Sequence, residues 1–107
     1  MPEKFVPIAK LDEIPNGGTL PRQAGEVEIA LCNVDGKIYA VQNVCTHDDG
    51  ILTGGGLDGH EIVCPRHGAR FDVRTGDVLQ MPAPVPIQTF DTKIEGDTVY
   101  VKVDVDE

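Results

Sequence analysis

The sequence predicts an all-β fold, an antiparallel β sandwich or barrel that carries a small subdomain of loops and short strands. Glycine (12 residues) and proline (8 residues) are both above average for a chain of 107 residues, which favours turns over long helices. Apolar and polar side chains alternate in several short runs, and this period of two is typical of a half-buried strand. Turns that contain glycine separate these runs, as expected of hairpins.

Three hairpins are expected in order along the chain. In the first, Val27, Ile29 and Leu31 share one face of a strand, and Asp35-Gly36 turns the chain into a second strand over 37–41. Asp-Gly is the strongest short-range signal of a hairpin, because both central positions of the turn need a positive φ. The other two hairpins are expected at 71–79, with its turn at 75–76, and at 87–105, with its turn at 95–97.

The length suits one domain, so we expect residues 1–107 to fold as a single unit. A helical turn is expected near 11–14 and a short strand at 61–63. Residues from about 43 to 70 differ from the rest, since they hold all three histidines, two of the three cysteines and six of the twelve glycines. Loops on a rigid scaffold carry function, so this region is predicted to hold a ligand.

The charge of the chain excludes one class of partner. The formal net charge is -9, from 18 acidic and 9 basic residues. Such a surface repels phosphate, so nucleic acid is not an expected partner. The charge either serves solubility or steers the protein toward a basic docking surface, and both readings stay open. No secretion signal or membrane-spanning run is recognisable, so a cytoplasmic protein without membrane contact is expected.

Two short motifs are predicted to bind metal. Cys45-Thr46-His47 and Cys64-Pro65-Arg66-His67 each pair one thiol with one imidazole. Two such loops facing each other can present two sulfurs on one side and two nitrogens on the other, which an asymmetric [2Fe–2S] cluster requires. We therefore expect one iron on Cys45 and Cys64 and the other on His47 and His67.

Two other uses of the same residues are less consistent with the pattern. A structural zinc site could use these four ligands, but common zinc modules pair Cys with Cys and His with His. A cysteine nucleophile with a histidine base is disfavoured by two equivalent pairs and by the lack of a third, orienting group. Cys32 and His60 are placed outside the site, the first as a small buried apolar side chain and the second as a solvated one.

The paired motif is C-x-H at 45–47 followed by C-x2-H at 64–67, which opens the longer string CPRHGARFDVRTG, and it resembles the Rieske-type ferredoxins of bacterial ring-hydroxylating dioxygenase systems. The resemblance covers nearly the whole chain, because the hairpins and Met81-Pro82-Ala83-Pro84 also fit. It implies the Rieske iron–sulfur fold and one [2Fe–2S] cluster per chain. It also implies that the proline loop 81–86 packs over the cluster, and that electrons pass through the outer edges of His47 and His67.

The chain departs from the respiratory members of this family at four positions. Gly50 and Arg66 stand where those proteins have a second cysteine pair, so no disulfide links the two loops. Ala69 and Phe71 stand where a serine and a tyrosine donate hydrogen bonds to sulfur. Without those bonds the reduced cluster is less stable, so a potential of about -150 mV, low for a Rieske centre, is expected.

The resemblance implies a one-electron carrier rather than an enzyme. It is expected to be monomeric and to pass electrons from an NAD(P)H-dependent flavoprotein ferredoxin reductase to a terminal oxygenase of aromatic hydrocarbon catabolism. The chain has neither a dinucleotide-binding glycine motif nor a 2-His-1-carboxylate iron site, so it does not catalyse the oxygen chemistry itself. The alternative is the Rieske small subunit of an assimilatory NAD(P)H nitrite reductase.

Overall fold

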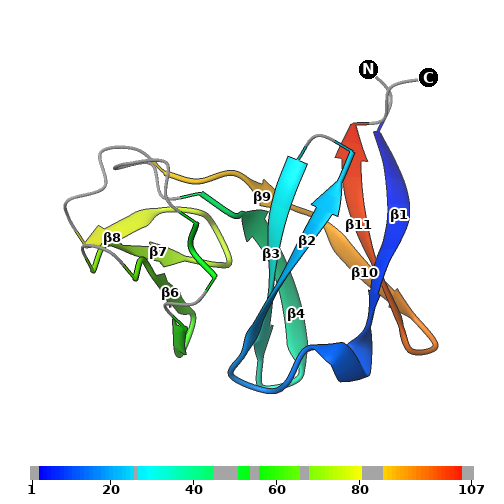
Figure 1. Ribbon diagram of the computed structural model, residues 1–107, viewed down its shortest axis with the longest axis horizontal. Coiled ribbons are helices and arrows are strands. Elements are labelled where there is room, and N and C mark those ends of the chain that lie inside the picture. Colours follow the sequence, from blue (N-terminus) through cyan, green and yellow to red (C-terminus); the bar gives the residue numbers. More distant parts are fainter. Residues whose placement is uncertain are drawn as a thin grey trace.

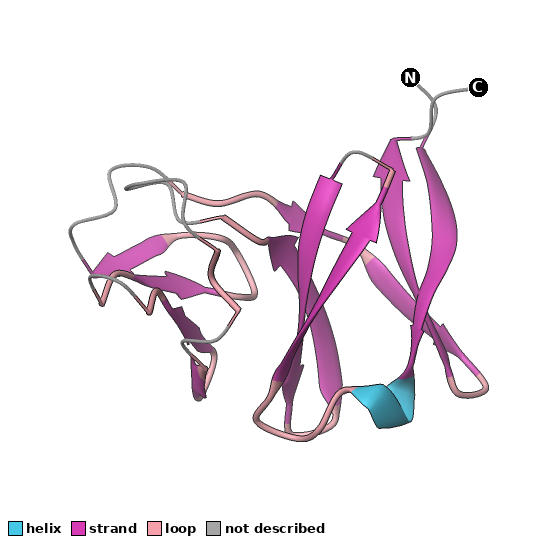
Figure 2. Cartoon of the chain, in the orientation of Figure 1, coloured by secondary structure: helices cyan, strands magenta, loops and turns pink. Residues whose placement is uncertain are grey.

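A computed structural model describes residues 3–25, 27–44, 51–53, 56–65, 68–80 and 86–104. Within these ranges the chain forms antiparallel strands in three sheets, together with one 3₁₀ turn, η1 (Leu11–Glu13) (Figure 2). The expected all-β fold is therefore confirmed, and η1 confirms the helical turn expected near 11–14. No helix among the described residues is long and apolar enough to cross a bilayer.

Two of the sheets form the larger, base part of the molecule, drawn on the right in Figure 1. The first has the order β1 (Glu3–Lys10), β11 (Thr98–Asp104), β10 (Thr92–Glu95). The second has the order β2 (Thr19–Ala24), β3 (Val27–Val34), β4 (Lys37–Gln42), β9 (Thr89–Phe90). Side chains from both sheets, including Ile29, Leu31, Val99 and Val101, form one hydrophobic core between them.

The third sheet forms a separate subdomain, drawn on the left in Figure 1. Its order is β5 (Leu57–Asp58), β6 (Glu61–Val63), β7 (Arg70–Asp72), β8 (Val78–Gln80). It lies between β4 and β9 in the sequence, and the chain enters and leaves it at adjacent points. There the Gln42 amide donates to the Gln88 carbonyl at 2.8 Å, and the Gln88 amide donates to Gln42 Oε1 at 3.3 Å.

The three expected hairpins are present. In the turn between β3 and β4, Asp35 and Gly36 have φ values of 53° and 88°, the positive angles that the Asp-Gly pair predicts. β7 and β8 form the second hairpin, and β10 and β11 form the third. The run predicted over 87–94 is divided, because β9 pairs with β4 in one sheet and β10 pairs with β11 in the other.

β1 and β2 have no counterpart in the sequence-based prediction. Each contains a proline, Pro7 or Pro21, which weakens the strand signal because proline cannot donate to a ladder. Both strands lie at the edge of their sheet, where a missing donor is tolerated. The two segments become strands because β1 pairs with β11 and β2 pairs with β3. Neither segment would be recognised as a strand from its own sequence.

The central strand β3 is buried on both faces, which sequence alternation alone does not predict. Ile29 and Leu31 point into the core of the base. The side chains on the opposite face of β3, Ala30, Cys32 and Val34, belong to a second core that includes residues of the subdomain. The subdomain therefore covers the face of the sheet that would otherwise meet solvent.

Candidate metal centre

Of the four predicted cluster ligands, the structure describes Cys64. Cys45, His47 and His67 lie outside the described residues, as do Gly50, Arg66 and residues 81–85 of the predicted proline loop. Among the residues that are described, no three His, Cys, Asp or Glu side chains are grouped as metal ligands would be. What the structure does define is how the bases of the three predicted loops are held.

The second loop is the tip of the β6–β7 hairpin. Cys64 directly follows β6, and it is 1% exposed. Its amide donates to the Ala69 carbonyl at 2.7 Å, and its carbonyl accepts from the Gly68 amide at 3.1 Å. Gly68 has a φ of 77°, which glycine adopts without strain. These bonds hold the backbone of Cys64 against Gly68 and Ala69, so Cys64 is a rigidly held thiol at the start of the predicted ligand pair.

The first loop is held by the side chain of Asn43, which follows β4 and is buried. Asn43 Oδ1 accepts from the amides of Leu52 and Thr53, each at 3.0 Å. Asn43 Nδ2 donates to Thr53 Oγ1 at 3.2 Å. These bonds bring Leu52 and Thr53 back to the end of β4, and residues 44–51, which include Cys45 and His47, lie between the joined points.

The third loop is held between Gly76 and Ile87. The Ile87 amide donates to the Gly76 carbonyl at 2.9 Å. Gly76 has a φ of 82°, and a Cβ at this position would collide with the Ile87 carbonyl oxygen. Only glycine satisfies both conditions, so this contact requires glycine. It fixes the end of the predicted proline loop 81–86 beside the β7–β8 hairpin.

The bases of the three loops share one hydrophobic core. Leu52, Cys64 and Ile87 are buried in it, one from each loop base, together with Ala69 and Phe71. Three loops that start from one rigid core can act on the same group, and a donor set of two thiols and two imidazoles suits a Rieske cluster. The residues present therefore fit a [2Fe–2S] cluster.

Charged side chains hold the outer surface of the subdomain. Asp72 Oδ1 accepts from the Arg74 amide at 2.9 Å, and Asp72 Oδ2 accepts from Arg74 Nη2 at 2.9 Å. Hydrogen bonds from Arg74 lower the pKa of Asp72, although partial burial acts in the opposite direction. Arg70 Nη1 donates to Asp58 Oδ2 at 2.9 Å and to Glu61 Oε1 at 3.4 Å, and the Asp58 hydrogen bond raises the pKa of Arg70.

Cys32 and His60 were both predicted to lie outside the site. Cys32 is fully buried in β3, and this burial raises the pKa of its thiol to about 12. A buried thiol that stays protonated behaves as a small apolar side chain, which fits the predicted structural role. His60 is half-buried rather than freely solvated, and its ring lies edge-on to the Tyr39 ring with the centroids 6.0 Å apart.

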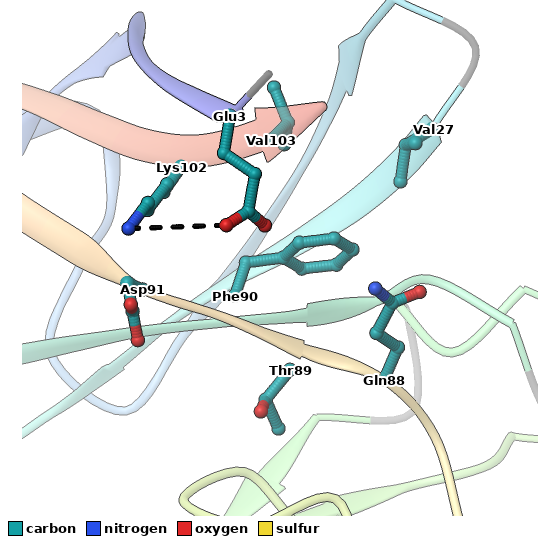
Figure 3. A pocket seen from close by; sticks show the side chains of 8 residues that line it. All are labelled: Glu3, Val27, Gln88, Thr89, Phe90, Asp91, Lys102 and Val103. Carbon is teal, nitrogen blue, oxygen red and sulfur yellow. Dashed lines mark ion pairs between the residues drawn. The ribbon is translucent and has the colours of Figure 1, made fainter. Parts of the chain in front are cut away.

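A surface pocket of about 220 Å³ lies elsewhere, lined by β9 and the residues beside it, by β11, and by the first residues of β1 and β3 (Figure 3). Its polar wall includes Asp91 and the Glu3–Lys102 ion pair, in which the charged atoms are 4.0 Å apart. None of its lining residues is a cysteine or histidine. The pocket therefore offers no ligands of the predicted kind, and the candidate centre remains at the three loop bases.

Sequence reasoning did not find Asn43, Asp72 or Gly76 as residues that support the site. An asparagine two positions before Cys45 is a weak signal, because its partners are backbone amides that come close only in the folded chain. Gly76 was recognised as part of a turn, but its close approach to Ile87 is a tertiary contact. The position of Gly76 in a turn predicts only its positive φ.

Comparison with known proteins gives the family. A model of the Rieske [2Fe-2S] domain matches residues 4–91. The ferredoxin component of the naphthalene 1,2-dioxygenase system of Pseudomonas aeruginosa is 44% identical over 101 residues, 94% of this chain and 97% of that protein. The ferredoxin component of the naphthalene 1,2-dioxygenase/salicylate 5-hydroxylase systems of Ralstonia sp is 41% identical over 104 residues, 97% of this chain and all (100%) of that protein.

Solved structures agree with these relatives. The ferredoxin of carbazole 1,9a-dioxygenase from Nocardioides aromaticivorans IC177 has a TM-score of 0.87 and 30% identity, over 92% of this chain and 96% of that one. A chain in the complex of reduced oxygenase and oxidized ferredoxin in carbazole 1,9a-dioxygenase has a TM-score of 0.84 and 31% identity, over 91% of each chain. A nitrite reductase small-subunit structure from Mycobacterium tuberculosis has a TM-score of 0.86 at 16% identity, which shows the fold alone.

Proposed function

The chain belongs to the Rieske [2Fe-2S] domain family, and from this premise we propose that it is the ferredoxin component of a ring-hydroxylating dioxygenase system. In that role it carries one electron at a time to a terminal oxygenase, and it is an electron-transfer component rather than an enzyme. The observation that carries the proposal is identity above 40%, over nearly the full length of both chains, to ferredoxin components of such systems.

The cofactor is one [2Fe–2S] cluster per chain. When bound, it supplies a site that accepts and releases a single electron. We assign Cys45 and Cys64 to one iron and His47 and His67 to the other. The support is the spacing of the two motifs together with the buried, hydrogen-bonded position of Cys64. We also propose that residues 1–107 form one domain, with the cluster-binding region at about 43–70 and the proline loop at 81–86.

The described residues of the chain hold and shield this site. Asn43, the Cys64–Ala69 bond and the Gly76–Ile87 bond fix the bases of the three loops. Ala69 and Phe71 are fully buried in the same core as Cys64. Neither side chain has a hydroxyl group that could donate a hydrogen bond to sulfur. These two apolar side chains exclude water from that side, and we expect them to contribute to a low potential.

We further propose the route by which electrons leave and the partners that receive them. The outer edges of His47 and His67 are the expected exit, since an electron must leave from an atom that a partner can approach. The electron donor would be an NAD(P)H-dependent flavoprotein ferredoxin reductase, and the setting would be the cytoplasm, with the protein as a monomer. The net charge of -9 suits docking to basic surfaces, and raising the salt concentration should then slow reduction.

The small subunit of a nitrite reductase was the alternative. Two nitrite reductase small-subunit structures resemble this chain at 16% and 17% identity, so they support the fold and give this function no separate support. Copurification with a large sirohaem-containing subunit would favour the alternative, whereas isolation of the chain as a free monomer would favour the electron shuttle.

The test is to measure iron, sulfide and electron transfer in the purified protein and in two matched cysteine variants. The wild type should contain about two iron and two sulfide ions per chain and give a rhombic EPR signal after reduction. It should also pass electrons from a flavoprotein reductase with NADH to an aromatic-ring dioxygenase.

Cys64→Ala should lose the iron, whereas Cys32→Ala should keep it, because both thiols lie in the same core but only Cys64 is an assigned ligand. A colourless wild-type protein that binds one zinc ion would contradict the proposal. So would a Cys64→Ala variant that keeps a full iron content.

A further inference from the structure

Two buried asparagines lie at opposite ends of the β3–β4 pair and make similar hydrogen bonds. Asn33 is 7% exposed and stands near the hairpin turn, whereas Asn43 is 3% exposed and follows the far end of β4. In each, the amide nitrogen donates one bond and the amide oxygen accepts from the backbone. They form a natural pair for comparison, because residue type, burial and bonding are alike.

The two asparagines hold different parts of the chain. Asn33 Nδ2 donates to the Ile14 carbonyl at 2.7 Å, and Asn33 Oδ1 accepts from the Gly36 amide at 2.8 Å, so both bonds stay within the base. Asn43 Oδ1 accepts from two successive amides, those of Leu52 and Thr53. The covalent chain between Asn43 and Leu52 contains the first predicted ligand pair, so these bonds fix where that loop begins and ends.

A physical link runs from Asn43 to the second ligand loop. The Leu52 amide is held by Asn43, and the Leu52 side chain is fully buried. That side chain belongs to the same core as Cys64. A packed core transmits displacement because it contains few voids. Movement of Leu52, at the described end of the first loop, is therefore transmitted to Cys64, at the start of the second.

We propose that Asn43 is a positioning residue for the iron–sulfur cluster, fixing the 44–51 loop against the core that carries Cys64. The inference rests on the proposed function, because it takes Cys45, His47, Cys64 and His67 as the ligands. It goes further in assigning a role to a side chain that is not itself a ligand. Burial alone does not confer this role, since Asn33 is nearly as buried and bonds only within the base.

The experiment compares Asn43→Ala with Asn33→Ala in the cluster-loaded protein. Each variant removes a buried acceptor and leaves at least one backbone amide without it, so both should unfold at lower denaturant concentration than the wild type. Only Asn43→Ala should release iron to a chelator at least about tenfold faster, equivalent to about 1.4 kcal/mol, and broaden the EPR signal of the reduced cluster. Asn33→Ala should stay within about twofold of the wild-type release rate.

Two further variants separate position from stability. Asn43→Asp keeps an acceptor for both amides and should restore the wild-type release rate and EPR signal. Asn43→Gln keeps both polar groups but moves them by one carbon, so it should show faster release even if Asn43→Ala does not fold. In the cluster-loaded protein, hydrogen exchange at Leu52 and Thr53 should be faster in Asn43→Gln than in Asn43→Asp.

Equal release rates in Asn43→Gln and Asn43→Asp, or in Asn43→Ala and Asn33→Ala, would overturn the inference while leaving the proposed function intact. A wild-type protein that holds no iron–sulfur cluster would overturn the proposed function and this inference with it. The wild-type iron content therefore shows which of the two has failed.

Discussion

The base and the subdomain of this protein are held together in different ways. In the base, β3 has 8 residues and β11 has 7, and their inward side chains are buried aliphatic residues. In the subdomain, β6, β7 and β8 have 3 residues each, and β5 has 2. Strands this short give few ladder hydrogen bonds, so they are marginal without other support.

The subdomain obtains that support from the core that it shares with β3 and from single contacts at loop ends. Asn43 and Gly76 each close one loop, and Asp72 with Arg74 holds the turn after β7. Each of these contacts depends on a single side chain or a single glycine, so one substitution can remove it. The base, in contrast, distributes its stability over long ladders, and a single loss there should matter less.

The largest expected difference between the two parts follows removal of the cluster. Metal ligation contributes to folding where the surrounding structure is weak. We expect amides of β6 and β7 to exchange at least about tenfold faster in the chelated protein, whereas amides of β11 should change by less than about twofold. Hydrogen exchange followed by mass spectrometry measures both. Equal protection of β6 in the two forms would show that the subdomain does not depend on its cofactor.

Gly76→Ala should be the most damaging single substitution at the joint between the two parts. The added Cβ would collide with the Ile87 carbonyl oxygen, and the φ of 82° would be strained as well. We expect a loss of about 3 kcal/mol in the free energy of unfolding, together with partial loss of iron.

Gly59→Ala is the matched control for this substitution. Gly59 has a φ of 61° in the same subdomain, but a Cβ there meets nothing within 4 Å. It should therefore cost only about 1 kcal/mol, the cost of the backbone conformation alone. Urea unfolding measures both variants, and similar losses would mean that the contact with Ile87 is unimportant.

Asp72→Asn should have a smaller effect that depends on pH. The folded pKa of Asp72 lies below its unfolded value of about 3.9. The stability from this carboxylate is therefore present above pH 4 or so and is lost as the pH falls through the folded pKa.

At pH 7 the substitution should cost about 1–2 kcal/mol, and the difference from the wild type should shrink in strong acid. Asp97→Asn is the control, because its ion pair with Lys10 is exposed, and it should cost less than about 0.5 kcal/mol. Thermal unfolding at several pH values distinguishes the two. A cost for Asp72→Asn that stays constant with pH would contradict the role of Arg74 in holding the carboxylate charged.

The parts of the fold that sequence could predict are those with local signals. Asp35 and Gly36 specify their turn because the required positive φ values select these residues. Val27, Ile29 and Leu31 indicate a strand by their spacing. In contrast, β1 and β2 contain prolines and become recognisable as strands only through the partners that lie far away in the sequence.

The candidate site divides in the same way. The four predicted ligands follow from motif spacing, and the family match supports the cluster that they were predicted to bind. Asn43 and Gly76 could not be recognised as supports, since their partners, Leu52 and Ile87, are identified only when the chain has folded. Spacing gives the chemistry of the ligands, while the supports depend on contacts between loops.

The sequence by itself determined that this chain is an all-β protein with two Cys/His pairs, because hairpin turns and short motifs depend on neighbouring residues. Tertiary structure alone decided that β3 is buried on both faces and that its second face lies in a core shared with Cys64. A side chain's burial depends on what covers it, and here the cover is a subdomain built from residues much later in the chain.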